Sequence, residues 1–211
     1  MKVLVIDIGG THVKLLATGQ DEPVKFVSGP TLTPARMVAG VKKLGRGWKY
    51  HAISMGYPGL VLHGRRPVKI INDAAMQALG SYKGGKMLFL GLGTGLGSAL
   101  VVDGIVEPME LGHLPYRKGT YETYVGQRGL EQRGKKKWRR HVAEVVAGLI
   151  AALEPDDVVL GGGNVRKLKE LPAGCRAGDN ANAFVGGGRL WEQAAPRLVR
   201  NVLEKRKGIA S

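Results

Sequence analysis

The stretch KVLVIDIGGT at residues 2–11 decides the fold of this chain. Its apolar, largely β-branched start is typical of a buried strand, and it runs through Asp7 into a Gly-Gly-Thr turn. A second apolar run, residues 13–17, follows the turn directly. Because glycine accepts the positive φ angles of tight turns, the pattern predicts two strands joined as a hairpin.

The same pattern returns later in the chain. Residues 87–90 are an apolar run, GLGTGLG at 91–97 is a turn, and residues 98–102 are a returning strand. This echo of residues 3–17 predicts a duplicated α/β unit. Neither turn has the Gly-Lys-Ser/Thr ending of a Walker loop, and neither leads into a helix as a dinucleotide-binding turn does.

The remaining elements follow from apolar spacing and turn residues. Thr33 and Pro34 predict a helix start, as cap and first helical residue, and Asp103-Gly104 predicts a hairpin turn. The Gly-rich residues 80–85 are a candidate domain boundary. We also expect strands at 24–27, 51–55, 68–71 and 158–160, and helices at 74–79, 142–153 and about 190–205.

The composition limits the class of protein. The chain has 211 residues, enough for one ordinary domain or two small ones, and 44% of them are hydrophobic, which excludes general disorder. Its 33 glycines have no three-residue period, so a collagen-like chain is excluded. The formal net charge of +15 indicates a polyanionic partner of unspecified kind.

Cysteine usage and apolar run length predict a soluble, cytoplasmic protein with no membrane partner. The single cysteine, Cys175, forms no internal disulfide, and no Cys/His cluster has zinc spacing. The start meets Asp7 too early for a signal peptide. The apolar helical segment 142–153 contains Glu144 and is too short to span a membrane.

The two Gly/Thr turns have the chemistry of phosphate-binding loops. Glycine lets backbone N–H groups approach phosphate oxygens, and a threonine hydroxyl adds a donor. A carboxylate at the position of Asp7 can hold Mg²⁺, directly or through water, beside a phosphate. The alternative is two ordinary hairpins whose glycines serve turn geometry alone.

Six blocks in order resemble the ROK family (repressors, open reading frames, kinases) of the actin-like ATPase and sugar-kinase superfamily. The presence of GTGLGSAL and the lack of zinc cysteines resemble the polyphosphate glucokinase branch. The stretch GDNANAF at 178–184 also looks familial. The six blocks are DIGGT at 7–11 with Lys14, GYPG at 56–59, Asn72-Asp73, GTGLGS at 93–98, ELGH at 110–113 and GGGN at 161–164.

The resemblance implies an α/β fold of two actin-like (ribonuclease H-like) domains with a cleft between them, here residues 1–83 and 84–211. The last helix would pack back on the first domain. It implies a sugar kinase that transfers a phosphoryl group from polyphosphate or ATP to glucose or a related hexose. Mg²⁺ would be the cofactor, zinc is not expected, and the protein would form a homodimer.

Asp73 is the candidate catalytic residue. It lies where a predicted strand ends and a helix begins, and an aspartate there can accept the proton of an attacking hydroxyl. The resemblance gives Asp73 this general-base role. The alternative is that Asn72 or Asp73 only caps the helix at 74–79.

The resemblance also implies three groups of binding residues. Alternatives remain, since Glu110 and His113 could be surface residues, and Asn164 could cap a helix that includes Leu168. Sugar contacts are Gly59, Asn72, Asp73, Glu110, His113 and, more weakly, Glu122; phosphate contacts are Gly9, Gly10, Thr11, Lys14, Gly93, Thr94 and Gly95; nucleotide contacts are Gly161, Gly162, Gly163 and Asn164.

One part of the ROK pattern is missing. The strands at 51–55 and 68–71 should be parallel neighbours, yet only eight residues, 60–67, lie between GYPG and Val68, too few for a crossover helix. ROK kinases carry a longer segment here, with an Asn and a Trp that help to bind the sugar. Either this protein lacks the crossover, or the sequence omits a stretch near Arg65-Arg66.

A basic run occupies residues 133–141, RGKKKWRRH. Basic residues around an aromatic can track a phosphate chain, and the run precedes the predicted helix at 142–153. The alternative is a solvated face with Trp138 in the core. The residues expected to bind a polyphosphate donor are Lys135, Lys136, Lys137, Arg139 and Arg140.

Two other functions stay open. A catalytically impaired ROK-type protein that binds a sugar or nucleotide, or regulates, would fit a chain that truly lacks the crossover. A nucleic-acid-binding protein is supported by charge alone, without a recognised motif, and is therefore the weaker alternative.

Overall fold

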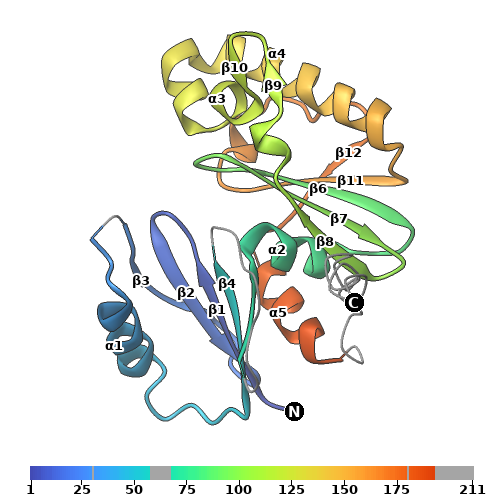
Figure 1. Cartoon of the computed structure of the whole chain (residues 1–211). Coiled ribbons are helices and arrows are strands. Elements are labelled where there is room, and N and C mark those ends of the chain that lie inside the picture. Colours follow the sequence, from blue (N-terminus) through green and yellow to red (C-terminus); the bar gives the residue numbers. More distant parts are fainter. Residues whose placement is uncertain (30, 58–67, 180, 193–211) are drawn as a thin grey trace, which may run out of the picture.

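The computed structural model describes residues 1–29, 31–57, 68–179 and 181–192, and contains two five-stranded mixed sheets built on one plan (Figure 1). The first sheet has the order β3-β2-β1-β4-β5, and the second has the order β12-β11-β6-β7-β8. Their strands are β1 (Val3–Ile8), β2 (His12–Ala17), β3 (Val24–Val27), β4 (Ala52–Tyr57) and β5 (Val68–Asn72), then β6 (Lys86–Leu92), β7 (Leu96–Val102), β8 (Ile105–Met109), β11 (Asp157–Gly161) and β12 (Cys175–Ala177).

The pairing confirms the duplicated unit. In each sheet an antiparallel meander, β1-β2-β3 or β6-β7-β8, is extended on its other side by two parallel strands. The expected parallel pairing of the fourth and fifth strands is present, with Ile53 opposite Val68. The residues that connect β4 to β5, including Gly59 and the proposed crossover gap, lie outside the described residues.

Helices cover both faces of each sheet. They are α1 (Pro34–Leu44), α2 (Asp73–Ser81), α3 (Tyr121–Val125), α4 (Gln127–Leu153) and α5 (Asn182–Glu192). Along β1, Leu4 and Ile6 face the α1 side while Val3 and Val5 face α5. The second sheet lies between α4, which contacts Leu88 and Leu90, and α2, which contacts Phe89. Alternation along the strands therefore aims Asp7 at the side of the sheet where α2 and α5 lie.

Two helices from distant parts of the chain, α2 and α5, pack closely against each other (Figure 1). A Cβ on Gly80 would lie 1.8 Å from the Asn182 carbonyl oxygen, and one on Gly186 would lie 1.8 Å from the Met76 carbonyl oxygen. Only glycine allows this backbone approach. Ser54 Oγ of β4 donates to the Gly187 carbonyl at 2.6 Å, so α5 packs back on the first sheet.

Several local predictions are confirmed. Thr33 caps α1 by accepting the Arg36 N–H at 3.3 Å, and Pro34 is the first helical residue. Asp103 and Gly104, with φ of 49° and 80°, form the turn between β7 and β8. The division into two domains at residues 83 and 84 stays a prediction.

Three helix predictions are wrong in extent. The basic run does not precede a helix but lies inside α4, which begins at Gln127 and is interrupted at Gly134, where φ is +70°. The helix expected after Asn164 is a single 3-10 turn, η2 (Val165–Lys167). The last helix begins at Asn182, well before residue 190, and is described only to Glu192, so Pro196 and residues 193–205 lie outside the described residues. No helix in the described part of the chain is both long and apolar enough to cross a membrane.

Candidate functional site

The two Gly/Thr turns face each other across the two sheets. A Cβ built on Gly10, in the β1–β2 turn, would lie 3.1 Å from Thr94 Oγ1, in the β6–β7 turn. The duplicated hairpins therefore bring backbone donors from two distant stretches to one place. This is the geometry required for one phosphate chain to be bound from both sides.

Asp7 is the buried acid of the first loop. It is 6% exposed, and its register partner Lys14 places Nζ 3.5 Å from Asp7 Oδ2. Burial raises the pKa of Asp7, while the charge and hydrogen bond of Lys14 oppose this rise. The rest of the turn is ordered by Ser28, whose Oγ donates to the Gly9 carbonyl at 2.6 Å.

Asp73 is the first residue of α2 and lies near Asp7. Burial raises the pKa of Asp73, the Ala74 N–H opposes the rise, and the negative charges of Asp7 and Glu110 add to it. Asn72 is the helix cap, because its Oδ1 accepts the N–H groups of Ala74 and Ala75 at 2.9 and 3.2 Å. The capping alternative therefore holds for Asn72, whose Oδ1 accepts two N–H groups. The Asp73 carboxylate accepts the Ala74 N–H through Oδ1 at 2.8 Å and lies near the acids Asp7 and Glu110.

The second loop takes its support from distant residues. Asn164 is buried, and its Nδ2 donates to the Gly93 carbonyl and to Gln127 Oε1, both at 3.1 Å. The Gln127 N–H, at the start of α4, is shared between the carbonyls of Gly93 and Thr94 at 3.0 Å. Asn164 makes no side-chain cap bond to η2, so the helix-cap alternative is wrong, and its amide instead fixes the loop.

The predicted sugar contacts Glu110 and Glu122 lie near Asp73 and the second loop, respectively. Glu110 precedes the 3-10 turn η1 (Leu111–His113) and His113 ends it, with His113 Nε2 3.5 Å from Glu110 Oε2. The His113 side chain is 66% exposed and that of Glu110 is 56% exposed. Exposed, adjacent groups of this kind can bind neighbouring hydroxyls. Glu122, at the start of α3, lies against the second loop, because its Oε2 is 2.6 Å from a Cβ built on Gly95.

The GGGN block packs against the end of β6. Gly162 has a φ of +86°, and a Cβ there would lie 2.5 Å from the Leu92 carbonyl oxygen. Gly161 likewise leaves room for the Phe89 ring, whereas Gly163 faces open space. Two of the three glycines are therefore required by packing, and Gly163 is the one that leaves space for a ligand.

The basic run on α4 contains both buried and exposed side chains. Trp138 is fully buried, and its Nε1 donates to the Val125 carbonyl at 2.7 Å, so it belongs to the core. Arg139 is partly occupied, since Nε and Nη2 both donate to the Lys167 carbonyl. The exposed cations of the run are Lys135, Lys136, Lys137 and Arg140.

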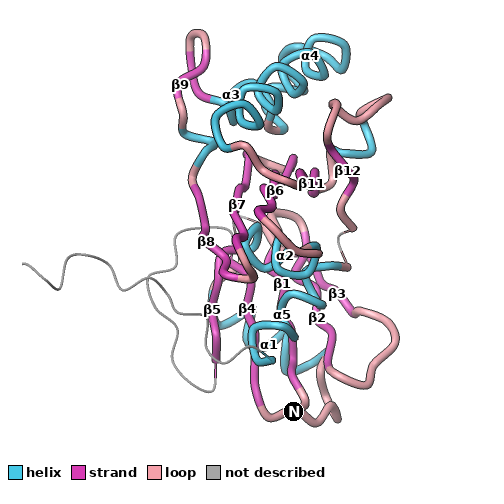
Figure 2. The backbone as a smooth tube through the Cα atoms, turned by 90° about the vertical axis from the view of Figure 1, so that its right-hand side faces the viewer, coloured by secondary structure: helices cyan, strands magenta, loops and turns pink. Residues whose placement is uncertain are grey.

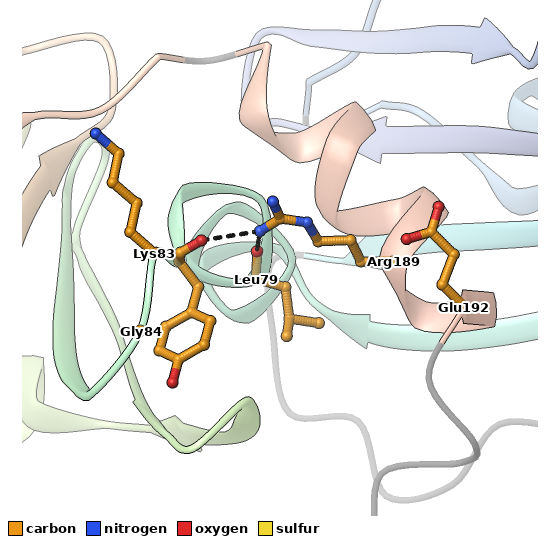
Figure 3. Close-up of a pocket in the computed structure, with 6 residues that line it drawn as sticks. Leu79, Lys83, Gly84, Arg189 and Glu192 are labelled. Atoms are coloured by element: carbon orange, nitrogen blue, oxygen red, sulfur yellow. Dashed lines mark hydrogen bonds between the residues drawn. The ribbon is translucent and has the colours of Figure 1, made fainter.

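A separate pocket opens at the other end of α2, about 13 Å along the helix from Asp73 (Figure 3). Arg189 of α5 lies at its centre and donates to the carbonyls of Leu79 and Tyr82 at 2.6 and 3.0 Å. These bonds supply a side-chain donor to carbonyls at the helix end, where intrahelical partners are few. The pocket is thus part of the contact between α2 and α5, remote from the two loops.

Comparisons with known proteins agree with this geometry. A polyphosphate glucokinase of Mycobacterium tuberculosis is 27% identical over 215 aligned positions, which take in 77% of each chain. The solved inorganic polyphosphate/ATP-glucomannokinase of Arthrobacter sp. strain KM superposes with a TM-score of 0.77 at 22% identity, over 89% of this chain and 97% of that one. The chain has the fold of the ROK sugar kinases.

A second ROK fold confirms this. A ROK family glucokinase from Streptomyces griseus, solved in complex with glucose and AMPPNP, gives a TM-score of 0.73 at 16% identity, over 90% of this chain and 99% of that one. No family model matches the chain. The alignment with the mycobacterial relative has 215 positions but takes in only 77% of this 211-residue chain, and the relative therefore has segments that this chain lacks.

Among the described residues, no three His, Cys, Asp or Glu side chains gather in a group able to hold a metal. Mg²⁺ in phosphoryl-transfer sites usually needs one or two carboxylates, with phosphate and water supplying the other ligands. Asp7 fits that requirement, because it is a buried carboxylate at a phosphate-type loop, and its charge reaches a second acid, Asp73, whose pKa it raises.

Proposed function

We propose that this protein is a sugar kinase that transfers a phosphoryl group from ATP or polyphosphate to glucose or a related hexose. The observation that carries the proposal is the convergence of two Gly/Thr loops, Asp7 and Asp73, at one place. The names of the relatives support the same activity. The cytoplasmic location, the homodimer and the two-domain division remain predictions from the sequence.

In the proposed mechanism, the loops position the donor and Asp73 activates the acceptor. N–H groups of Gly10 and Gly95, with the hydroxyls of Thr11 and Thr94, would bind the phosphates. The N–H groups of Gly9 and Gly93, also expected as phosphate contacts, already donate to the carbonyls of His12 and Gly95 within their turns. Mg²⁺ held near Asp7 would neutralise charge on the transferring group. Glu110, His113 and Glu122 would bind the hexose hydroxyls beside Asp73.

Asp73 takes the proton of the attacking sugar hydroxyl. At the same time the oxygen of that hydroxyl bonds to the terminal phosphorus of the donor, and the bridging P–O bond of the donor breaks. Burial and neighbouring acids raise the pKa of Asp73, which makes its carboxylate a stronger base. The proton then leaves Asp73 for solvent, and the shortened donor and the sugar phosphate dissociate.

The test is formation of sugar phosphate by the full chain with ATP or polyphosphate. Asp73→Asn keeps the shape and removes the base, and we expect kcat to fall by about 100- to 10,000-fold. Asp21→Asn is the matched control, because Asp21 is exposed in the turn between β2 and β3, at the opposite end of β2 from the first Gly/Thr turn. Turnover by Asp73→Asn within tenfold of the parent would remove Asp73 as the base. Absence of turnover with every hexose would favour a binding or regulatory protein.

For the donor, we propose that the exposed cations of α4 bind the distal part of a polyphosphate chain. The helix begins at the second loop, where Gln127 contacts Gly93, and the cations follow along it. Arg139 binds the donor less directly than the lysines, because the Lys167 carbonyl already accepts two of its N–H groups. Its charge remains part of the basic surface.

Neutralising Lys135, Lys136 and Lys137 together should raise KM for long polyphosphate and flatten its salt dependence. The slope of the logarithm of polyphosphate affinity against the logarithm of salt concentration should fall by up to about one unit for each phosphate that the surface no longer neutralises. KM for ATP, whose phosphates end at the loops, should stay the same. Lys42→Ala, in the exposed part of α1, is the control.

Equal polyphosphate affinity and salt slope before and after the change would exclude this surface as the donor site. Salt-sensitive binding of nucleic acid without sugar phosphorylation would favour the nucleic-acid alternative.

A further inference from the structure

The stretch between the predicted sugar contacts contains a hairpin that cannot hold itself in place. Strands β9 (Pro115–Tyr116) and β10 (Gly119–Thr120) have two residues each, and they join η1, which carries His113, to α3, which carries Glu122. An isolated two-stranded hairpin is marginal in water even when longer. The position of this hairpin must therefore come from contacts with the rest of the molecule.

Those contacts come from α4. The Tyr116 hydroxyl bonds to Glu144 Oε2 and lies 3.1 Å from His141 Nδ1, and Arg117 Nη2 donates to the same Glu144 oxygen at 2.7 Å. His141 and Glu144 are one turn apart on the helix, so they present one combined surface to the hairpin. We call Tyr116, Arg117, His141 and Glu144 the clamp.

The hydrogen-bond pattern of the clamp has one consistent arrangement. The Tyr116 hydroxyl has a single proton, and the Glu144 carboxylate can only accept, so this proton is donated to Glu144. Tyr116 then accepts a bond, and its donor is the Nδ1–H of His141. Both His141 and Glu144 of α4 therefore bond to the Tyr116 hydroxyl of the hairpin.

Aromatic packing extends the clamp to α3. The Tyr116 ring meets those of Tyr124 and His141 edge-on, at centroid distances of 5.1 and 5.8 Å, and Tyr124 meets His141 at 5.0 Å. Edge-to-face pairs at these distances are attractive. Since Tyr124 lies two residues after Glu122, the clamp contacts the middle of the stretch from Glu110 to Glu122, at Tyr116, and the helix at its Glu122 end. Figures 1 and 2 place β9, α3 and α4 together, at the end of the molecule opposite the N-terminus.

We propose that Tyr116, His141 and Glu144 are positioning residues that hold the hexose-binding stretch, residues 110–122, against α4. This inference rests on the proposed sugar kinase activity for its functional consequence, although the structural consequence is independent of it.

The test compares Tyr116→Phe and Glu144→Gln with two matched controls. Tyr121→Phe removes a hydroxyl from the same aromatic cluster, and this hydroxyl bonds to none of the described residues, while Glu107→Gln changes an exposed acid on β8. We expect the clamp variants to raise hexose KM about 5- to 10-fold, with donor KM unchanged and kcat within twofold. Because both changes weaken or remove the Tyr116–Glu144 bond, the effect of the double variant should be smaller than the product of the single effects.

Amide hydrogen exchange of residues 110–122, on the same full-length variants, gives a readout that needs no activity. Both clamp variants should exchange faster there than the parent, while α4 beyond Leu149 and both controls stay unchanged. Unchanged exchange at 110–122, or a rise in donor KM instead of hexose KM, overturns the proposal. If the parent phosphorylates no hexose, the proposed function fails, and the exchange result alone decides whether the clamp holds this stretch.

Discussion

The two Gly/Thr hairpins have the same topology but obtain their properties differently. The β1–β2 hairpin carries its own charged groups, with Asp7 opposite Lys14 in the register. The β6–β7 turn, residues 91–97, has no charged residue, and Asn164 and Gln127 fix its shape from elsewhere in the chain. We infer that the first copy supplies chemistry and the second supplies geometry.

The helices that cover the two sheets, α1 and α4, also differ in how much they bury. α1 covers the first sheet without burying any residue completely, whereas α4 covers the second and buries seven, among them Trp138 and Val142. Burial of apolar surface is the main source of stability. The second sheet is therefore the firmer platform, and the first sheet and its loop carry the reactive groups.

Between the two loops, the largest effect should come from the charge of the first. We expect Asp7→Asn to lower kcat by about 100-fold or more, because a carboxylate that orders Mg²⁺ is worth several kcal/mol of transition-state stabilisation. Thr94→Val, in the second loop, should cost only about tenfold, since it removes one hydrogen bond from an uncharged hydroxyl to a phosphate. Steady-state kinetics at saturating sugar measure both. A larger loss for Thr94→Val would reverse the comparison between the loops.

Next in size is the support of the second loop. Asn164→Ala leaves Gln127 Oε1 without a donor and leaves the Gly93 carbonyl with only its shared bond from the Gln127 N–H, which costs about 1–3 kcal/mol and should raise donor KM roughly tenfold. Hexose KM should not change. Gln127→Ala should act in the same direction, and the double variant should be less than additive, because the two side chains share one contact. Donor KM equal to that of the parent would show that the loop keeps its shape without Asn164.

A smaller effect is expected on the less buried layer. Thr33→Ala removes the N-cap of α1 and should lower the free energy of unfolding by about 1 kcal/mol, with kcat unchanged. Chemical denaturation measures the first quantity, and Thr31→Ala, in the preceding loop, is the control. A loss of kcat would mean that α1 affects the site, and it would contradict the interpretation that α1 has a structural role only.

The smallest effect concerns the pH dependence of stability. The hydrogen bonds from Tyr116 and Arg117 lower the pKa of Glu144 to about 2. A depressed carboxylate stabilises the fold above its unfolded pKa of 4.5, and this contribution fades as pH falls towards 2. The parent should therefore exceed Glu144→Gln in Tm at pH 7 and approach it near pH 2. The difference should shrink with salt, because Glu144 is half-exposed. A Tm gap that stays constant from pH 7 to pH 2 would exclude the ionised pair as its cause.

Local sequence signals predicted the elements that depend on local chemistry. Thr33-Pro34, Asp103-Gly104 and the two Gly/Thr turns specify their own backbone, so their positions are correct. Glycines are misleading signals where packing decides. Gly186 and Gly187 weaken a helix locally, yet α5 contains both because Gly186 meets the backbone of α2 and Gly187 meets Val5, each too closely for any side chain.

The site residues likewise divide into those that local sequence signals predict and those that depend on distant partners. Asp7, Asp73 and the two loops were predicted from their places at strand ends and turns, and the duplicated pattern in the sequence was sufficient to expect two similar loops. The role of Asn164 and the clamp on α4 were not predicted, because each depends on a partner far away in the chain.

The sequence alone therefore determined the two hairpins, their acid and their glycines, because turn geometry and strand alternation are properties of a few neighbouring residues. Only the tertiary structure decided which loop is supported by Asn164, which cations of the basic run are exposed, and how residues 110–122 are held. The physical reason is that hydrogen bonds and close packing between distant segments depend on where whole sheets and helices lie, which no short stretch encodes.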